Sequence, residues 1–203
     1  MLKSVLMTAA AAMVALTTMT SVATSATVTS LSDNFDSETQ ALNYGAFANW
    51  NVSNGTVDVI GTPGRFPLCD SANCVDLDGS TSNAGDLTTK DTFAAGTYEL
   101  SFRLAGNQRR SSLNDGVDIS FGGLIATLTK AHNDPFQLYT YIVTLASADY
   151  LSFSHAGGDN IGLLLDDVNV TAVPLPAALP LYGAGLAAMG FVGWRRKQKL
   201  AKT

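Results

Sequence analysis

The sequence predicts an all-β fold class: an antiparallel β-sandwich of the jelly-roll type, flanked by an N-terminal signal peptide and a C-terminal transmembrane helix. Two observations in the middle of the 203-residue chain support the sandwich. Apolar and polar residues alternate with a period of two, which is typical of half-buried strands. Clusters of Gly, Asn, Asp and Pro separate these short runs, and no extended window of this region shows helical periodicity. Short strands at this spacing are typical of sandwiches and jelly rolls.

The N-terminus has the layout of a secretory signal peptide. Lys3 supplies the charged start, an apolar run follows from Val5 to Leu16, and small residues lead to Ala26. The apolar run is shorter than the ~20 residues that a membrane-spanning helix needs. We therefore expect signal peptidase to remove residues 1–26. Cleavage after Ala23 and a retained membrane anchor are the alternatives.

Residues 27–172 are expected to form the sandwich. The clearest strand alternates Tyr98, Leu100, Phe102 and Leu104 on one face with charged and hydroxyl residues on the other. The Gly122-Gly123 pair lies between two alternating runs and predicts a tight hairpin. Other strands are expected at Val117–Phe121, Leu124–Leu128, Tyr139–Leu145 and Leu151–Phe153, and the last strand at Ile161–Val170.

The net charge of residues 27–172 limits the kinds of partner that this region can bind. All seventeen acidic residues of the chain lie in 27–172, together with only six basic residues, so its net charge is −11. Nucleic acid is excluded as a partner, because its phosphates would be repelled. The charge is suited to solubility outside the cell and to the binding of cations.

The two cysteines are expected to form a disulfide. Cys69 and Cys74 lie in one loop, and the oxidising compartment implied by export favours a bridge between them. A redox-active pair is the alternative. It is disfavoured because such pairs usually have the Cys-x-x-Cys spacing and open a helix.

Adjacent carboxylates in the last predicted strand are candidate metal ligands. Asp166 and Asp167 should point to opposite faces, so one of them needs an ion-pair, hydrogen-bond or metal partner. Ca²⁺ would satisfy such a group with hard oxygen ligands. A solvated pair at a strand end is the alternative. A second acidic run, Asp70 to Asp78, could wrap a cation, or it could be a polar turn before a strand.

Neither stacking nor catalysis has a strong signal. Trp50 is a candidate for stacking on a sugar ring, with Tyr139 and Tyr141 behind it; the alternative is that Trp50 belongs to the core. His132 and His155 fall in predicted turns, and no serine lies in a Gly-x-Ser-x-Gly elbow. We expect a protein that is not an enzyme. Paired carboxylates of a glycoside hydrolase remain the alternative, because their separation is spatial.

The C-terminus combines a short motif, an apolar segment and a basic end. The motif 173–178 contains Val173, Pro174, Leu175, Pro176 and Ala177. The segment 179–194 carries no charge and is about 24 Å long as a helix. That length is slightly short of the bilayer core, which the membrane can accommodate by thinning. The basic tail 195–203 begins with Arg195, Arg196 and Lys197 and would stay cytoplasmic.

This tail resembles the PEP-CTERM sorting signal in its Val-Pro-Leu-Pro-Ala variant, with Leu175 where the commoner motif has Glu. The resemblance implies processing by an exosortase, a membrane cysteine transpeptidase, in a Gram-negative bacterium that makes exopolysaccharide. The protein would be held transiently in the inner membrane and then reach the cell surface or the medium. A plain membrane anchor that is never cut is the alternative.

The middle region resembles the jelly-roll carbohydrate-binding-like domains of many PEP-CTERM proteins. The matching segments are Asn34–Asp36, Trp50, Val75–Gly79, Ala95–Phe102 and Leu165–Val170. The resemblance implies a structural Ca²⁺ between the first and last strands, held by Asp36 or Glu38 together with Asp166 or Asp167. The sequence therefore predicts a non-catalytic surface or matrix protein that binds Ca²⁺ and exopolysaccharide. A secreted hydrolase and an inert coat protein are the alternatives.

Overall fold

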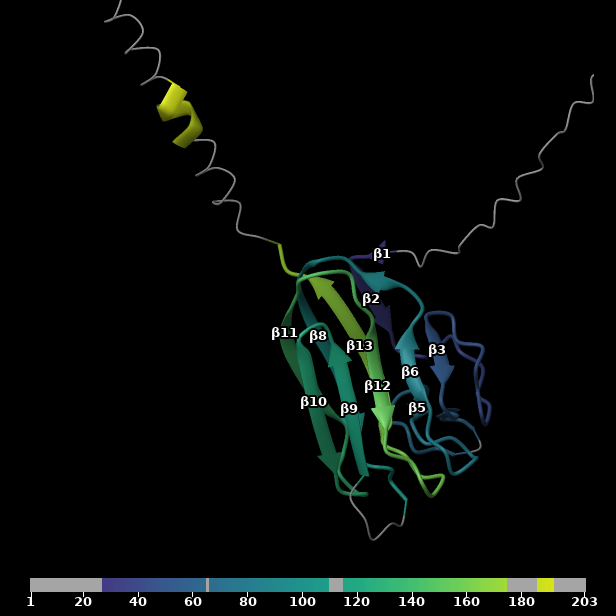
Figure 1. The fold of residues 1–203 in the computed structure, drawn as a ribbon. Coiled ribbons are helices and arrows are strands. Elements are labelled where there is room, and N and C mark those ends of the chain that lie inside the picture. Colours follow the sequence, from purple (N-terminus) through teal and green to yellow (C-terminus); the bar gives the residue numbers. More distant parts are fainter. Residues whose placement is uncertain (1–26, 65, 110–114, 175–185, 192–203) are drawn as a thin grey trace, which may run out of the picture.

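The computed structural model describes residues 27–64, 66–109, 115–174 and 186–191. The described residues between 27 and 174 include a five-stranded and a six-stranded sheet that pack face to face, as Figure 1 shows. In the five-stranded sheet the order is β10 (Leu124–Lys130), β9 (Asp115–Phe121), β12 (Leu151–His155), β6 (Asp86–Thr89) and β3 (Trp50–Ser53). In the six-stranded sheet it is β11 (Gln137–Leu145), β8 (Gly96–Ala105), β13 (Leu164–Ala172), β5 (Asn73–Asp76) and β4 (Asp58–Gly61), and β2 (Ser30–Asp33) also pairs with β13.

Every strand pair in these two sheets is antiparallel. This confirms the predicted antiparallel β-sandwich and is consistent with a jelly roll. A short parallel pair was not expected. It joins β1 (Thr27–Val28) to β7 (Thr92–Phe93) beside the sandwich.

The alternating runs form strands as their pattern predicts. In β8 the side chains of Tyr98, Leu100, Phe102 and Leu104 are all buried, because every second residue of a strand faces the core. The β9–β10 hairpin turns at Gly122-Gly123 and pairs Phe121 with Leu124. Gly122 has a φ of +59°, and a Cβ there would lie 2.2 Å from the Leu145 side chain. Glycine is therefore required at this turn.

The core lies between the two sheets and is rich in aromatic rings. Phe153 of β12 packs edge-on against Phe102 of β8 at a centroid distance of 5.1 Å, which joins one sheet to the other. The ring centroid of Trp50 in β3 lies 6.0 Å from that of Phe153. Burial of these rings supplies much of the driving force for packing the sheets.

The last strand differs from its predicted bounds. It starts at Leu164 instead of Ile161, and it continues beyond Val170 to Ala172. Its register against β8 shifts between Asp166 and Asn169, and Asp167 has a φ of +49°. This irregularity is a β-bulge, in which one strand has an extra residue and its local direction changes. A period of two cannot predict such an insertion.

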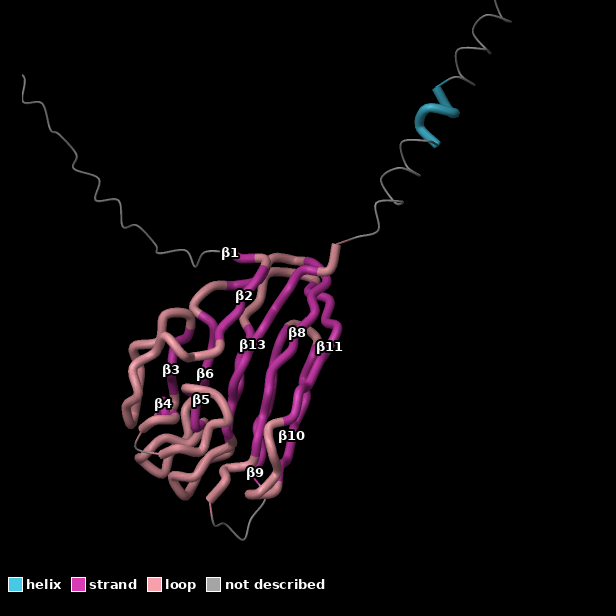
Figure 2. Tube along the Cα trace, turned by 180° about the vertical axis from the view of Figure 1, so that it is seen from behind, coloured by secondary structure: helices cyan, strands magenta, loops and turns pink. Residues whose placement is uncertain are grey.

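The two described ends of the sandwich lie together. β2 runs antiparallel to the end of β13, with Ser30 opposite Thr171, so the N- and C-terminal segments leave from the same end (Figure 2). The loops after β8 and β12 lie at the other end, where β13 begins. This second end is called the loop end below.

The C-terminal segment is described only in part. Residues 186–191 are helical. Within the described residues, no helix has the length and apolar character needed to cross a bilayer. The signal peptide, most of the predicted helix 179–194, Leu175 to Ala177 of the motif, and Arg195 to Lys197 lie outside the described residues.

Candidate functional site

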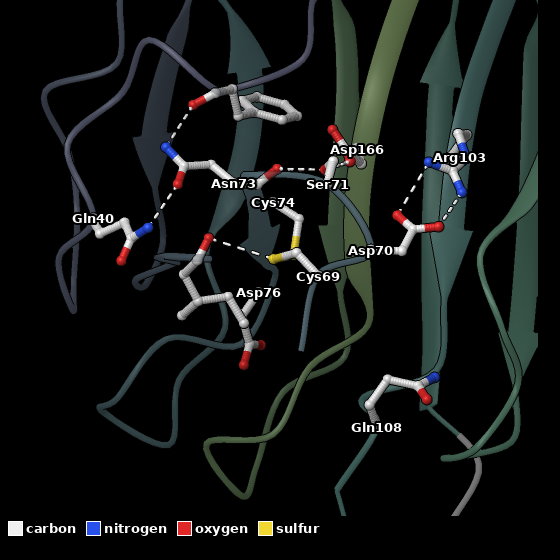
Figure 3. Close-up of a disulfide and its surroundings, with 12 residues drawn as sticks. Gln40, Cys69, Asp70, Ser71, Asn73, Cys74, Asp76, Arg103, Gln108 and Asp166 are labelled. Atoms are coloured by element: carbon white, nitrogen blue, oxygen red, sulfur yellow. Dashed lines mark hydrogen bonds and ion pairs between the residues drawn. A yellow bond between two sulfur atoms is a disulfide. The ribbon is translucent and has the colours of Figure 1, made fainter. Parts of the chain in front are cut away.

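The predicted disulfide is present. The Cys69 and Cys74 sulfur atoms are bonded, with their Cα atoms 5.8 Å apart. Cys74 belongs to β5, so the bridge fixes the preceding loop against the six-stranded sheet. In Figure 3 the bridge lies between the Gln40–Asn73 hydrogen bond on one side and the Asp70–Arg103 ion pair on the other.

The adjacent carboxylates of β13 lie on the same, outer face of the strand, so the prediction that they point to opposite faces is wrong. Leu165 and Val168, which flank them, both face the core, because the bulge inserts an extra residue between them. Asp166 is fully buried, whereas the side chain of Asp167 is 42% exposed and lies 3.4 Å from Arg103 Nη1. The partners of Asp166 are protein groups: the Ser71 hydroxyl donates to Oδ2 and the Asp167 N–H donates to Oδ1. Burial raises the pKa of Asp166 to about 6, and the Ser71 hydrogen bond opposes that shift.

The carboxylates near the first strand also have protein partners. Asp36 Oδ1 accepts from the backbone N–H of Asn73 at 2.9 Å. Glu38 accepts from Tyr44 Oη at 2.8 Å and from the N–H of Ala48 at 2.7 Å. Across the described residues, no three His, Cys, Asp or Glu side chains are grouped closely enough to hold a metal ion. The predicted ligands Asp36, Glu38 and Asp166 each have protein hydrogen-bond partners in this arrangement.

Trp50 belongs to the core. Its side chain is 0% exposed, and its indole Nε1 donates to Asp33 Oδ2 at 2.9 Å. A sugar cannot stack on a ring that is covered on both faces, so the interpretation of Trp50 as a ligand contact is wrong. The core alternative is correct. A lone Trp in a small β domain meets its apolar and hydrogen-bonding needs most easily in the interior.

A pocket of about 260 Å³ opens at the loop end of the sandwich. We call it the loop-end pocket. It lies between the start of β9 and the loop that follows β12. Its lining residues are Asp115, Gly116, His155, Ala156, Gly157, Gly158 and Asp159. Two carboxylates and one imidazole therefore line a hollow whose other walls are backbone and small side chains.

Behind this pocket lies a buried polar cluster. Asp78 is 0% exposed, and its Oδ2 accepts from the N–H of Asp159 at 3.4 Å. Asp76 is equally buried and pairs with Arg109 from the loop after β8. Asp76 Oδ1 accepts from the N–H groups of Asp78 and Gly162, at 3.1 and 2.8 Å. The cluster thus joins β5 to the two loops at this end.

In the described part of the chain, the buried side-chain nitrogen and oxygen atoms that lack a hydrogen-bond partner all lie in this region. Among the described residues they are Asp78 Oδ1, Arg109 Nε and His155 Nε2. Burying a polar atom without a partner costs about 1–3 kcal/mol, so folded proteins rarely retain such atoms without a reason. A site that binds water or a polar ligand is one such reason.

The protonation of the pocket follows from burial. Burial raises the pKa of Asp115, against the effect of a hydrogen bond from Asn107. Burial lowers the pKa of His155. The negative charges of the nearby carboxylates oppose this shift, and Asp115 has the largest opposing effect. His155 Nδ1 accepts from the N–H of Gly157 at 3.0 Å. The proton of the neutral imidazole is therefore on Nε2, which is a donor without an acceptor.

Burial raises the pKa of Asp76 to about 7, even though Arg109 lowers it. This carboxylate is sealed from solvent, so it does not meet a ligand in the pocket. Asp76 and Asp78 belong to the run from Asp70 to Asp78, for which the sequence offers a cation-binding loop and a polar turn as alternatives. The structure places both in the buried cluster instead.

A second hollow, of about 360 Å³, lies on the other side of the disulfide loop. It is lined by Gln40, Ala41, Leu42, Val59, Ile60 and Phe66. Gln40 supplies the amide group of this hollow, and its Nε2 already donates a hydrogen bond to Asn73 Oδ1 at 2.9 Å. It offers less polar chemistry than the loop-end pocket, although it is larger.

The comparisons with known proteins bear on the fold. No protein-family model matches the chain, and no curated protein shows significant sequence similarity to it. The K1 cleaved adhesin domain of Lys-gingipain from Porphyromonas gingivalis W83 is similar in structure, with a TM-score of 0.53 and 16% identity over 72% of this chain and 100% of that chain. The K3 cleaved adhesin domain of the same protein has a TM-score of 0.51 and 16% identity, over 69% of this chain and 95% of that chain.

A weaker likeness is to the CBM22-1 xylan-binding domain of Paenibacillus barcinonensis Xyn10C. It has a TM-score of 0.47 and 14% identity, over 76% of this chain and 100% of that chain. The fold is similar to that of the two adhesin domains. At these identities the likeness concerns the β-sandwich alone.

Proposed function

We propose that this protein is an exported surface or extracellular-matrix protein whose β-sandwich is a non-catalytic glycan-binding module. The observation that carries the proposal is the loop-end pocket, where polar side chains line a hollow backed by buried atoms without partners. Sugars present many hydroxyl groups, which can donate to carboxylates and accept from an imidazole N–H. The similarity to domains named adhesins is consistent with binding instead of catalysis.

Glycan binding can be measured with exopolysaccharide purified from the producing bacterium. We expect the full chain to retard in an affinity gel that contains this polymer. Asp159→Asn should weaken the retardation, because Asp159 is exposed at the pocket rim. Glu99→Gln is the matched control: it removes the same charge from an exposed position on β8. Equal migration with and without polymer would exclude the pocket as a site for this glycan.

Export and sorting complete the proposal. Residues 1–26 would direct secretion, the motif from Val173 to Ala177 would be processed by an exosortase, and Arg195 to Lys197 would hold the tail in the cytoplasm until then. The disulfide supports an oxidising destination. The residues that line the loop-end pocket belong to the start of β9 and the loop after β12, at the end opposite to the one where β13 finishes. A domain tethered by its C-terminal tail would therefore present the pocket outward.

Sorting is tested by intact mass and by deletion. Protein recovered from the envelope and the medium should lack both terminal segments, and deletion of residues 173–203 should abolish retention in the envelope. If all recovered protein kept its full-length C-terminus, the tail would be a plain membrane anchor that is not processed. Unchanged retention of the deleted protein would remove the tail from the proposal altogether.

A hydrolase is the second candidate, and one observation favours it. Asp115 and Asp159 line the same pocket, and the raised pKa of Asp115 would help it to act as a proton donor. The full chain would then release reducing ends from the polysaccharide, and either Asp115→Asn or Asp159→Asn would abolish the release. Binding without release assigns the pocket to recognition. An inert coat protein would show neither.

A further inference from the structure

The loop-end pocket offers an unbalanced set of polar groups. Asp115 and Asp159 line it, and Asp78 lies directly behind Asp159 with one carboxylate oxygen free of hydrogen bonds in the described structure. Arg109 does not balance them, because its guanidinium is paired with Asp76 and also donates to the carbonyl of Asn160 at 3.2 Å. The pocket therefore has a surplus of negative charge and of hydrogen-bond acceptors.

His155 supplies a hydrogen-bond donor among these acceptors. It is 8% exposed and lines the pocket, and its Nε2–H is buried with no acceptor among the described residues. A ligand that fits must bring several donors near the carboxylates and one acceptor near this imidazole.

Two kinds of occupant are disfavoured. A metal ion needs several ligands at close range, and the described residues contain no such group of acidic, histidine or cysteine side chains. A neutral sugar held by stacking needs an aromatic platform, and none of the described lining residues is aromatic. The volume of about 260 Å³ lies just below the range for drug-sized ligands, which suits a single sugar ring.

We propose that the loop-end pocket binds a protonated amino sugar, the non-acetylated hexosamine unit of a polysaccharide. The ammonium group would donate to Asp115 and Asp159 in charge-assisted hydrogen bonds. The His155 imidazole would turn toward the ligand, so that its Nε2–H, which is buried without an acceptor in the described structure, donates to a neighbouring hydroxyl oxygen. An acetylated sugar has no ammonium group and adds bulk. A uronic acid would be repelled by the carboxylates. This inference rests on the proposed glycan-binding function and names its ligand class.

The test compares three oligosaccharides on the full chain by titration calorimetry in mildly acidic buffer. They are oligomers of glucosamine, of N-acetylglucosamine and of galacturonic acid, all of one length. We expect the glucosamine oligomer to bind at least tenfold more tightly than the acetylated one, and the galacturonic acid oligomer not to bind. Asp115→Asn and Asp159→Asn should each lower the affinity for the glucosamine oligomer about tenfold or more, because each removes a charge-assisted hydrogen bond.

The control addresses general attraction between a polycation and an acidic domain. Glu99→Gln removes one exposed carboxylate outside the pocket, so it should leave the affinity within about twofold. Thermal unfolding of each variant checks that it is folded. The inference is overturned if Glu99→Gln weakens binding as much as Asp159→Asn, or if the acetylated oligomer binds equally well. In the latter case the proposed function stands, whereas failure of all three oligomers and of the native exopolysaccharide would remove both.

Discussion

Arg109 donates to Asp76 in an ion pair whose two members differ sharply in exposure: the guanidinium side chain is 26% exposed and the carboxylate is 0% exposed. The pair joins the loop after β8 to the end of β5. Because Asp76 lies behind the loop-end pocket, the shape of the pocket depends on this contact. The strength of this ion pair can be measured from the free energy of unfolding of variants that lack it.

Replacement of Arg109 should be costly. At a pH of about 9, where Asp76 is ionised in the wild type, Arg109→Gln leaves a buried carboxylate without its cation, and we expect the free energy of unfolding to fall by about 3–5 kcal/mol. Arg103→Gln is the control, because its partner Asp70 is 47% exposed and such a surface pair contributes about 0–1 kcal/mol. Urea denaturation followed by circular dichroism measures both. Equal losses would show that the Arg109 pair is not special.

The pH dependence of stability should reveal Asp76. Its pKa is about 7 in the folded protein, well above the usual value near 3.9 in an unfolded chain. The folded state therefore binds this proton more tightly, and the contribution of the group to stability falls as pH rises from about 4 to about 7. The stability of the wild type relative to Asp76→Asn should decline over this range and level off above it. A relative stability that increased with pH would contradict the raised pKa.

Loss of the disulfide should have a moderate effect. The bridge closes a short loop, with a sequence separation of 5, so the double variant Cys69→Ser, Cys74→Ser should lose about 2 kcal/mol of unfolding free energy. Reductant should lower the stability of the wild type by a similar amount and leave the double variant unchanged. A reductant effect on both proteins would point to a cause other than this bond.

The fluorescence of Trp50 should be that of a buried indole ring that no ligand contacts. In a Trp194→Phe background, Trp50 is the one remaining tryptophan of the chain. Its fluorescence should be blue-shifted and insensitive to any bound oligosaccharide. Trp50→Phe should destabilise the fold by about 1–3 kcal/mol, because Asp33 loses a buried hydrogen-bond donor. Quenching by a sugar would restore the stacking interpretation.

Calcium between the first and last strands stays a prediction. Asp36 and Asp166 now accept hydrogen bonds from Asn73 and Ser71, so Ca²⁺ would have to replace these donors. Bound Ca²⁺ should raise the midpoint of thermal unfolding relative to EDTA, and Asp166→Asn should remove the difference. Glu99→Gln serves as the charge-matched control. Identical midpoints in Ca²⁺ and EDTA would remove calcium from the proposal.

The strands could be predicted because their burial follows a local rule. The alternation in β8 and the Gly122-Gly123 hairpin are visible within a few residues, and so is the need of Asp166 for a partner. The bulge at Asp167 and the identity of that partner are not local. Ser71, the donor to Asp166, is 95 residues away in the chain.

The candidate site was missed for the same reason. Asp76, Arg109 and Asp159 each lie in a segment that reads as an ordinary turn or strand end. The contact between Asp76 and Arg109 spans 33 residues, and that between Asp78 and Asp159 spans 81. Only the order of strands in the sheets brings them to one end. The glycines beside His155 mark a turn in the sequence, but they do not show that its imidazole turns inward.

The position of β13 has a mechanical consequence. The strand begins at the end that carries the loop-end pocket and leaves the sandwich at the end from which the C-terminal segment departs. A pull between a ligand in the pocket and a tethered tail would therefore run along this strand. The hydrogen bonds of an antiparallel ladder are perpendicular to the strands, so β8 and β2 would share the load across many bonds at once. Such a geometry resists tension by shear, instead of opening one bond after another.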